Sequence, residues 1–208
     1  MKIILYFLQY IFIKLFFLIC KIIGFKKASN FGKFVGEKIG PIFKSKAIIK
    51  KNINLILPNT SQENIDIITK KMWGNYGRIL SEYVFLEGFR KGSLEKYLNI
   101  TGLEYLNEIK KKNIPVVFIS GHFNNFELMA MQIEKSGLEL GAIYRPLNNF
   151  FLNSTMENIR KKFICRNQIK KGLSGIREIL NLFKKNKSIA LMIDQRVTEG
   201  IKSTFFKK

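Results

Sequence analysis

The sequence predicts an α/β fold: a largely parallel or mixed sheet flanked by helices, preceded by an N-terminal membrane helix. Two observations predict the sheet. Short apolar runs bounded by proline, glycine or polar residues alternate with longer stretches whose apolar residues recur at helical spacing. This alternation is typical of parallel strands joined by helices. A third observation, a long apolar stretch at the start, predicts the membrane helix, and 208 residues with 47% hydrophobic content suit one such domain plus an anchor.

Residues 1–25 form a nearly continuous apolar stretch, interrupted by Gln9, Lys14 and Lys21. The stretch exceeds the roughly 20 residues that a bilayer-spanning helix needs, although a central lysine costs about 2.5 to 3.5 kcal/mol on insertion scales. A second arrangement is a helix lying in the membrane interface, because Lys14 and Lys21 are a heptad apart and share one face from which they can reach the headgroups. We expect a membrane anchor over residues 1–25, spanning or interfacial, and a second domain over residues 26–208.

The next elements are helices that carry no obvious chemistry. A capping-box pattern at residues 60–63 predicts the start of a long helix that runs to about residue 88. Arg78 and Glu82 are four residues apart on this helix and are expected to pair. A short strand is expected over residues 97–100, followed by a helix that begins near Gly102.

Residues 116–128, VVFISGHFNNFEL, are the centre of the sequence. The β-branched and aromatic run 116–119 predicts a buried strand, and the residues after Gly121 predict a helix capped by Asn124 or Asn125. His122, the single histidine of the chain, therefore lies in a strand-to-helix turn. In α/β proteins this is the usual place for ligands and reactive groups.

His122 and Glu127 together suggest a general base. Glu127 is expected in the first helical turn, from which its carboxylate can fold back toward one imidazole nitrogen and leave the other free to accept a proton. The backbone N–H groups of residues 123–125 are expected to point outward, where they can stabilise an oxyanion or hold a phosphate. No metal site is expected, because one histidine and scattered carboxylates make no ligand set.

The remaining sequence repeats the strand and helix alternation. Residues 138–144 predict a strand that ends at Arg145, and residues 153–163 predict an amphipathic helix with a basic face for membrane or an acidic protein. Residues 172–183 predict a further helix. Residues 188–194 predict a strand that ends at Asp194 and Gln195. Residues 199–206 look like the start of a following strand.

The motif GHFNNFEL resembles the lysophospholipid acyltransferase superfamily, whose signature is a histidine, four residues and an acid. Glutamate as the acid, preceded by asparagine and an aromatic residue, is most similar to the lipid A biosynthesis branch of late acyltransferases of the lauroyl or myristoyl type. Residues 144–147, YRPL, and the pair Asp194 and Gln195 resemble two further segments of that family. The resemblance implies a glycerolphosphate-acyltransferase-like fold, a helix carrying Arg78 and Glu82 beside the active site, and a C-terminal part that this chain lacks.

The resemblance also implies roles for individual residues. His122 and Glu127 are the catalytic pair, and Asn124 and Asn125 are expected to contribute to substrate binding. Arg145 faces the cleft and engages acidic parts of the substrate, as its planar fork suits phosphate. The carboxylate and amide of Asp194 and Gln195 either bind a sugar hydroxyl or support a loop.

The implied reaction moves a fatty acyl chain from a thioester to a hydroxyl of a lipid A precursor in lipopolysaccharide biosynthesis. The donor is acyl carrier protein or coenzyme A thioester, so no separate cofactor is expected, and the partners are acyl carrier protein, an anionic glycolipid and the membrane. Lysines after residue 25 and two isolated cysteines, Cys20 and Cys165, place the domain on the cytoplasmic side of the bacterial inner membrane.

Two alternatives remain open. Within enzymes, the acceptor is a lysophospholipid or another glycolipid such as a mannoside. Outside enzymes, a net charge of +21 suits a basic membrane-surface or nucleic-acid-binding protein. The excess charge is mostly lysine and accompanies abundant Ile, Asn and Phe, the residues that A/T-rich coding sequence favours, so no nucleic-acid partner is expected.

Overall fold

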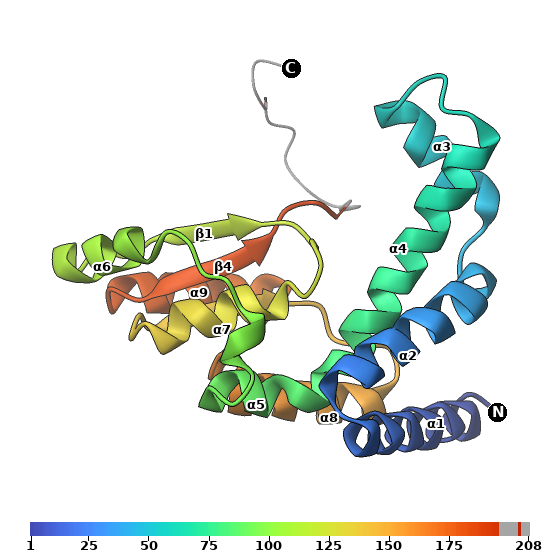
Figure 1. The fold of residues 1–208 in the computed structure, drawn as a ribbon. Coiled ribbons are helices and arrows are strands. Elements are labelled where there is room, and N and C mark those ends of the chain that lie inside the picture. The colour runs from blue at the N-terminus through green and yellow to red at the C-terminus, as the bar shows by residue number, and fades with distance from the viewer. Residues whose placement is uncertain (196–203, 205–208) are drawn as a thin grey trace.

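The computed structural model describes residues 1–195 and 204 (Figure 1). The strand expected over residues 199–206 therefore lies outside the described residues, apart from Thr204. The helices and strands, in chain order, are α1 (Lys2–Ile23), α2 (Phe25–Ile39), α3 (Lys46–Ile56), α4 (Gln62–Glu82), α5 (Leu86–Lys91), α6 (Leu103–Lys112), β1 (Val117–Ser120), α7 (Glu127–Lys135), β2 (Leu140–Tyr144), α8 (Phe150–Phe163), β3 (Asn167–Lys170), α9 (Leu173–Lys184) and β4 (Ser188–Met192).

The four strands form one sheet in the order β1-β4-β2-β3, and every neighbouring pair is parallel. This confirms the predicted α/β class. β4, although last in the chain, lies between β1 and β2, with Ser120 opposite Met192 and Gly141 opposite Ile189. Because all strands run the same way, the loops that follow β1, β2 and β4 leave the sheet at the same edge.

Two strand predictions differ from the structure. Residues 97–100 form no strand; a 3-10 turn, Glu95–Tyr97, is followed by irregular chain. β3 was not expected, because its sequence, NQIK, is too polar to signal a strand. β1 is also less buried than its sequence predicts, because it is the edge strand of the described sheet and the side chains of Val117 and Ile119 are exposed.

Glycines allow α2 and α4 to pack at very short range. Gly32 and Gly36 on α2 face Gly77 on α4, and a Cβ at any of the three would overlap backbone atoms of the opposite helix. Gly40, just after α2, abuts the Trp73 ring in the same way. The two helices lie side by side in Figure 1.

α1 belongs to the main hydrophobic core. Its buried residues Phe16, Phe17 and Cys20 join the same cluster as Tyr83 and Leu86, which lie beyond the end of α4. The rest of the core comes from α2, α4, α5, α7, β2, β4 and the residues that directly follow α8. The apolar N-terminal helix is therefore packed along the domain (Figure 1).

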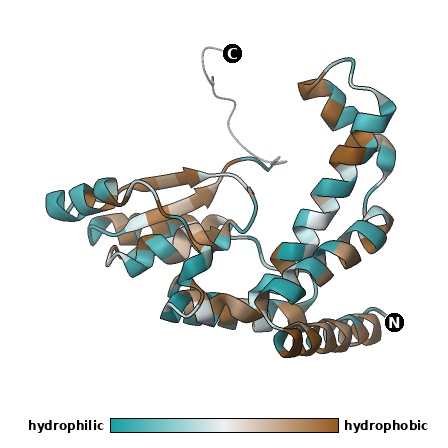
Figure 2. Cartoon of the chain, viewed as in Figure 1, coloured by the Kyte–Doolittle hydropathy of each residue, from teal (hydrophilic) through white to brown (hydrophobic). Residues whose placement is uncertain are grey.

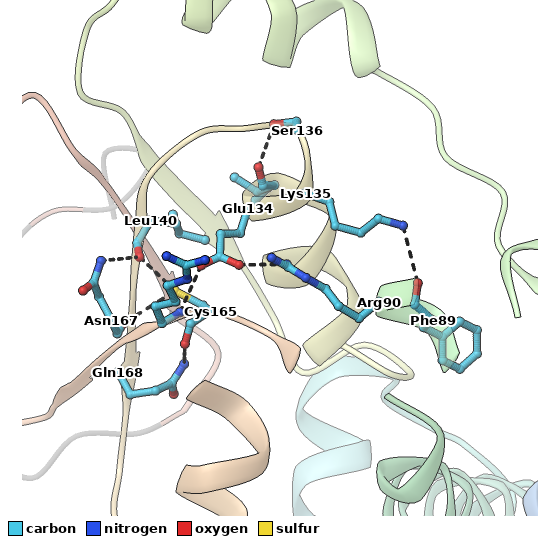
Figure 3. A network of polar contacts seen from close by, with 11 residues as sticks. Phe89, Arg90, Glu134, Lys135, Ser136, Leu140, Cys165, Asn167 and Gln168 are labelled. Carbon is cyan, nitrogen blue, oxygen red and sulfur yellow. Dashed lines mark hydrogen bonds and ion pairs between the residues drawn. The ribbon is translucent and has the colours of Figure 1, made fainter. Parts of the chain in front are cut away.

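A polar network fixes the C-terminal half of α7 (Figure 3). Glu134 forms an ion pair with Arg90 of α5 (2.7 Å) and accepts the backbone N–H of Arg166 (3.0 Å). Nearby, the Cys165 thiol donates to the carbonyl of Leu140 (2.8 Å). These contacts tie α7 to α5 and to the start of β3, so α7 has little freedom to shift along the sheet.

Candidate active site

The register of the sheet brings His122 and Asp194 together. β1 ends at Ser120 and β4 at Met192, which are opposite each other, and each residue of the pair follows its strand end by two positions. Ile193 donates its backbone N–H to the carbonyl of Ser120 (3.0 Å), which extends the pairing to the first of these positions. His122 and Asp194 therefore meet at the carboxyl edge of the sheet.

Asp194 holds His122 through two hydrogen bonds. Its Oδ2 accepts the backbone N–H of His122 (2.7 Å), and its Oδ1 lies 2.7 Å from imidazole Nδ1. An ionised carboxylate can only accept, so Nδ1 carries the proton and Nε2 presents its lone pair. The Gln195 side-chain amide lies 3.4 Å from Nε2, and the Phe126 ring packs against the imidazole at a centroid distance of 4.6 Å.

The same contacts keep Asp194 ionised. Partial burial acts to raise the pKa of Asp194, but the hydrogen bonds from the backbone and the imidazole of His122, and the charge of the ring when it is protonated, lower it below its ordinary value. The carboxylate stays negative over the physiological range. It can therefore stabilise an imidazolium when His122 takes a proton.

Glu127 bonds to Arg160 and Tyr83 in this structure, and not to His122 as expected. Glu127 is buried, and its Oε1 accepts from Arg160 (Nε at 2.8 Å and Nη2 at 2.5 Å) and from the Tyr83 hydroxyl. Because Glu127 starts α7 and Arg160 approaches from α8, the carboxylate points to the helices around the sheet. Nδ1 of His122 is taken by Asp194 instead.

Glu127, Arg160 and Tyr83 form a buried charged cluster. Burial opposes the charge of Arg160, but the attraction and hydrogen bonds of Glu127 raise its pKa above the ordinary value. Burial and the negative charge of Glu127 raise the pKa of the Tyr83 hydroxyl, which stays neutral and donates to the carboxylate. Arg160 also lies over the rings of Tyr83 and Tyr144, at 5.9 Å from each centroid. This cluster fixes the N-terminal end of α7 to α8 and to the 3-10 turn that follows α4.

The asparagines of the turn take separate places. α7 begins at Glu127 and has no side-chain cap, so the prediction that Asn124 or Asn125 caps it is wrong. Asn124 is exposed and adopts a left-handed conformation (φ 43°), which asparagine tolerates better than most residues. Asn125 donates to Glu82 of α4 (2.8 Å). A substrate-binding role of either side chain remains a prediction.

The backbone of the turn offers fewer free donors than expected. The N–H of Phe123 is bonded to the carbonyl of Gly121 (2.8 Å). Among the described residues, the N–H groups of Asn124 and Asn125 have no hydrogen-bond partner. Of the three backbone N–H groups expected as oxyanion donors, those of Asn124 and Asn125 therefore remain.

Glu82 connects the turn to α2. It accepts from Asn125 at one oxygen and from Ser29 at the other (2.7 Å), and Ser29 in turn accepts from Arg78 (2.8 Å). The predicted Arg78–Glu82 pair is thus replaced by an arrangement in which Ser29 lies between the two side chains. These contacts agree with the position beside the site that the family resemblance implies for α4, the helix that carries Arg78 and Glu82.

Arg145 is exposed directly after β2, two strands away from β1 and at the same edge as His122.

Two residues of the site were not predicted from the sequence. Arg160 was assigned to the basic surface of its helix, and Tyr83 was not expected to be a partner of Glu127. No local pattern marks either one, since 77 residues separate them. Among the described residues, no three His, Cys, Asp or Glu side chains gather as metal ligands would.

The arrangement is that of a general-base site. An imidazole at a sheet edge, with one nitrogen bonded to a carboxylate and the other unprotonated, can deprotonate a hydroxyl group. Two backbone N–H groups, unengaged among the described residues, follow within three residues of the base. Such an arrangement is typical of enzymes that activate a hydroxyl nucleophile.

The whole chain, residues 1–208, matches the family described as bacterial lipid A biosynthesis acyltransferase, and the chain belongs to that family. It is 26% identical over 174 residues to a lipid A biosynthesis palmitoleoyltransferase of Escherichia coli (strain K12), a match that covers 78% of this chain and 53% of the relative. A lipid A biosynthesis myristoyltransferase of the same organism is 21% identical over 135 residues, or 65% of this chain and 41% of the relative. The chain spans about half the length of these relatives.

Proposed function

We propose that this chain carries the acyl-transfer site of an enzyme that moves a fatty acyl chain from a thioester to a hydroxyl of a lipid A precursor. The observation that carries the proposal is the His122 imidazole in a chain of the lipid A acyltransferase family. The imidazole is bonded to Asp194 through Nδ1, and the Gln195 side-chain amide lies 3.4 Å from Nε2. The donor is acyl carrier protein or coenzyme A thioester. The relatives named for palmitoleoyl and myristoyl transfer support a long-chain acyl group.

The reaction begins when Nε2 of His122 removes the proton of the acceptor hydroxyl. The oxygen attacks the thioester carbonyl carbon and forms a tetrahedral oxyanion, while Asp194 stabilises the imidazolium. Collapse of the intermediate breaks the carbon–sulfur bond, and the imidazolium returns the proton to the departing thiolate. The products are an ester and a free thiol, and no acyl-enzyme is required.

The surrounding groups support the two charges that this path creates. The N–H groups of Asn124 and Asn125 can donate to the oxyanion, and Gln195 can hold the attacking hydroxyl beside Nε2. Arg145 is the exposed cation for the acceptor's phosphate or for the acidic carrier of the donor. Glu127 contributes by fixing the turn that carries His122 through Arg160 and Tyr83, rather than by touching the base.

Two features support a place at the bacterial inner membrane, with the site on the cytoplasmic side. α1 is long and apolar enough to interact with a bilayer. Both cysteines are free and buried, as in a reducing compartment.

The test is transfer of a labelled acyl chain from acyl carrier protein thioester to a lipid A precursor, using membranes from cells that express the protein. His122→Ala should abolish transfer, and Asp194→Ala should lower it strongly while the protein level in the membrane is unchanged. Coenzyme A thioester in place of acyl carrier protein identifies the donor. A His122→Ala protein that transfers at the parent rate would exclude the proposed base.

A further inference from the structure

α1 has two faces of opposite character. One face is packed on the protein and contains its buried residues Phe16, Phe17 and Cys20. The opposite face is solvent-exposed and apolar along its whole length; its residues are Ile4, Leu8, Ile11, Leu15, Leu18 and Ile22. At 100° per residue these six lie within about 80° of arc, so they form one continuous stripe. Figure 2 shows the helix as an apolar element on the outside of the molecule. An exposed stripe of this length needs an apolar environment to cover it.

The contacts of the packed face extend over both halves of the helix. Near the N-terminus, Phe7 and Tyr10 pack on Phe151 of α8, with ring centroids 5.6 and 5.9 Å apart. In the same region Asn149, which caps α8, donates to the carbonyl of Tyr6 (2.8 Å) and to the Gln9 side chain (3.1 Å). A helix that crossed the bilayer with these contacts intact would carry α8 into the hydrocarbon.

α8 is unsuited to that position. Its second half carries Arg160, Lys161 and Lys162, and Glu157 pairs with Lys161 (2.7 Å). Charged side chains at membrane depth are strongly disfavoured. α8 also contacts β3 of the sheet, so the domain would have to follow it into the hydrocarbon.

Lysines lie along one border of the apolar stripe. Lys14 and Lys21 are both exposed and a heptad apart, between the stripe and the side that contacts α8. At the C-terminal end of α1, the charge of Lys21 acts on Glu87 of α5: the hydrogen bond from Lys91 is the largest cause that lowers the pKa of Glu87, and the charges of Lys162 and Lys21 also lower it. An apolar stripe bordered by cations is complementary to an anionic lipid surface.

We infer that α1 lies in the plane of the membrane interface, with the stripe in the acyl region, the lysines at anionic headgroups and the domain on one side of the bilayer. In this orientation the stripe contacts lipid while the packed face keeps its contacts with α8 and the core. A spanning orientation would break the contacts with α8 or carry α8 into the hydrocarbon. Of the two arrangements that the sequence left open, the packing selects the interfacial one.

This orientation also places the site near the lipid surface. Arg145, at the catalytic edge, precedes Asn149 by four residues, so the loop between them reaches at most about 14 Å. Asn149 is the residue that binds α1. A lipid acceptor can therefore present a headgroup to Arg145 while its acyl chains remain in the membrane.

Cysteine labelling from each side of the membrane tests this orientation without any activity measurement. Lys2→Cys, at the first residue of α1, and Asn30→Cys, in α2, place exposed thiols at the two ends of α1 in separate variants. The parent is the blank because Cys20 and Cys165 are fully buried. An impermeant maleimide is applied to inverted and to right-side-out inner-membrane vesicles. We expect both variants to react in inverted vesicles and neither in right-side-out vesicles. Labelling of the two positions from opposite sides would show a spanning helix and overturn the inference.

Vesicle flotation tests the lipid contact. With vesicles containing phosphatidylglycerol, Lys14→Glu combined with Lys21→Glu should reduce bound protein about tenfold or more. Lys111→Glu combined with Lys184→Glu changes the charge equally at exposed positions on α6 and α9 and should have a much smaller effect. Equal losses in the two double variants would mean that net charge alone attracts the protein, and the α1 border would then have no specific role.

Discussion

At the scale of single residues, the catalytic edge depends on a carboxylate that lies 72 residues from the histidine it orients. The bond from Nδ1 to Asp194 determines which imidazole nitrogen carries the proton, and the bond from the His122 backbone fixes where that nitrogen points. A carboxylate in this position both selects the tautomer and stabilises the charged ring. Asp194 is therefore the residue whose loss should change the chemistry with the least change to the fold.

Asp194→Asn should reduce kcat by about 10²- to 10⁴-fold, because an amide can also donate to Nδ1 and so favours the wrong tautomer. The chain has a single histidine, so one pair of imidazole nitrogen-15 signals reports the tautomer directly. The parent should show a protonated Nδ1 and the variant a mixture or a protonated Nε2. An unchanged spectrum together with parental kcat would contradict the role of Asp194.

Glu127→Gln should reduce the free energy of unfolding by about 3 to 5 kcal/mol, since Arg160 would remain buried without a charged partner. The double variant Glu127→Gln with Arg160→Met should recover part of this loss, which a double-mutant cycle in urea measures. Activity should follow stability across the three variants. If Glu127→Gln lost activity at parental stability, Glu127 would act directly in catalysis.

The sequence located the members of the site but not their partners. His122 and Asp194 each follow an apolar run, so both were predictable as strand-end residues. Their pairing depends on the strand order, in which β4 inserts between β1 and β2, and no local pattern encodes that order. For Glu127, spacing alone favoured a turn toward His122, whereas the buried Arg160 and Tyr83 provide stronger partners that only the tertiary packing reveals.

At the scale of helices and strands, prediction succeeded where one signal was strong. β1, β2 and β4 are apolar runs, and α6 begins directly after Gly102 as expected. β3 was missed because a short polar strand has no such signal, and residues 97–100 have the signal but no neighbouring strand to pair with. The glycines of α2 are visible in the sequence, but their role in the close approach of α4 depends on the tertiary packing and was not predicted.

Gly36→Ala should reduce the free energy of unfolding by about 1 to 3 kcal/mol, because the added methyl group would overlap the backbone of α4 and separate the helices. Alanine favours helix by about 1 kcal/mol over glycine, so the same change in an open helix would stabilise it. Asn30→Ala, at an exposed position of α2, is the control and should be neutral or stabilising in a urea titration. A more stable Gly36→Ala protein would show that α2 and α4 are not in close contact.

The separation of α2 and α4 in Gly36→Ala should also disturb the active site. Ser29 of α2 and Glu82 of α4 are hydrogen-bonded, and Glu82 holds Asn125 in the turn after His122. We therefore expect Gly36→Ala to lower kcat more than it lowers the fraction folded, whereas Asn30→Ala should leave kcat unchanged.

At the scale of the whole molecule, α1 connects the hydrophobic core to the lipid, and adjacent residues on it should separate the two roles. Phe17 is buried in the core and Leu18 is on the exposed stripe. Phe17→Ala should reduce the free energy of unfolding by about 3 to 5 kcal/mol through loss of buried area and the cavity that remains. Leu18→Ala should change unfolding by less than about 0.5 kcal/mol but weaken partition into vesicles, since it removes apolar area that only lipid covers. Urea unfolding in detergent and vesicle flotation measure the two quantities. Loss of stability in both variants would mean that protein covers both faces of α1, and loss of partition in both would mean that α1 is an anchor independent of the core.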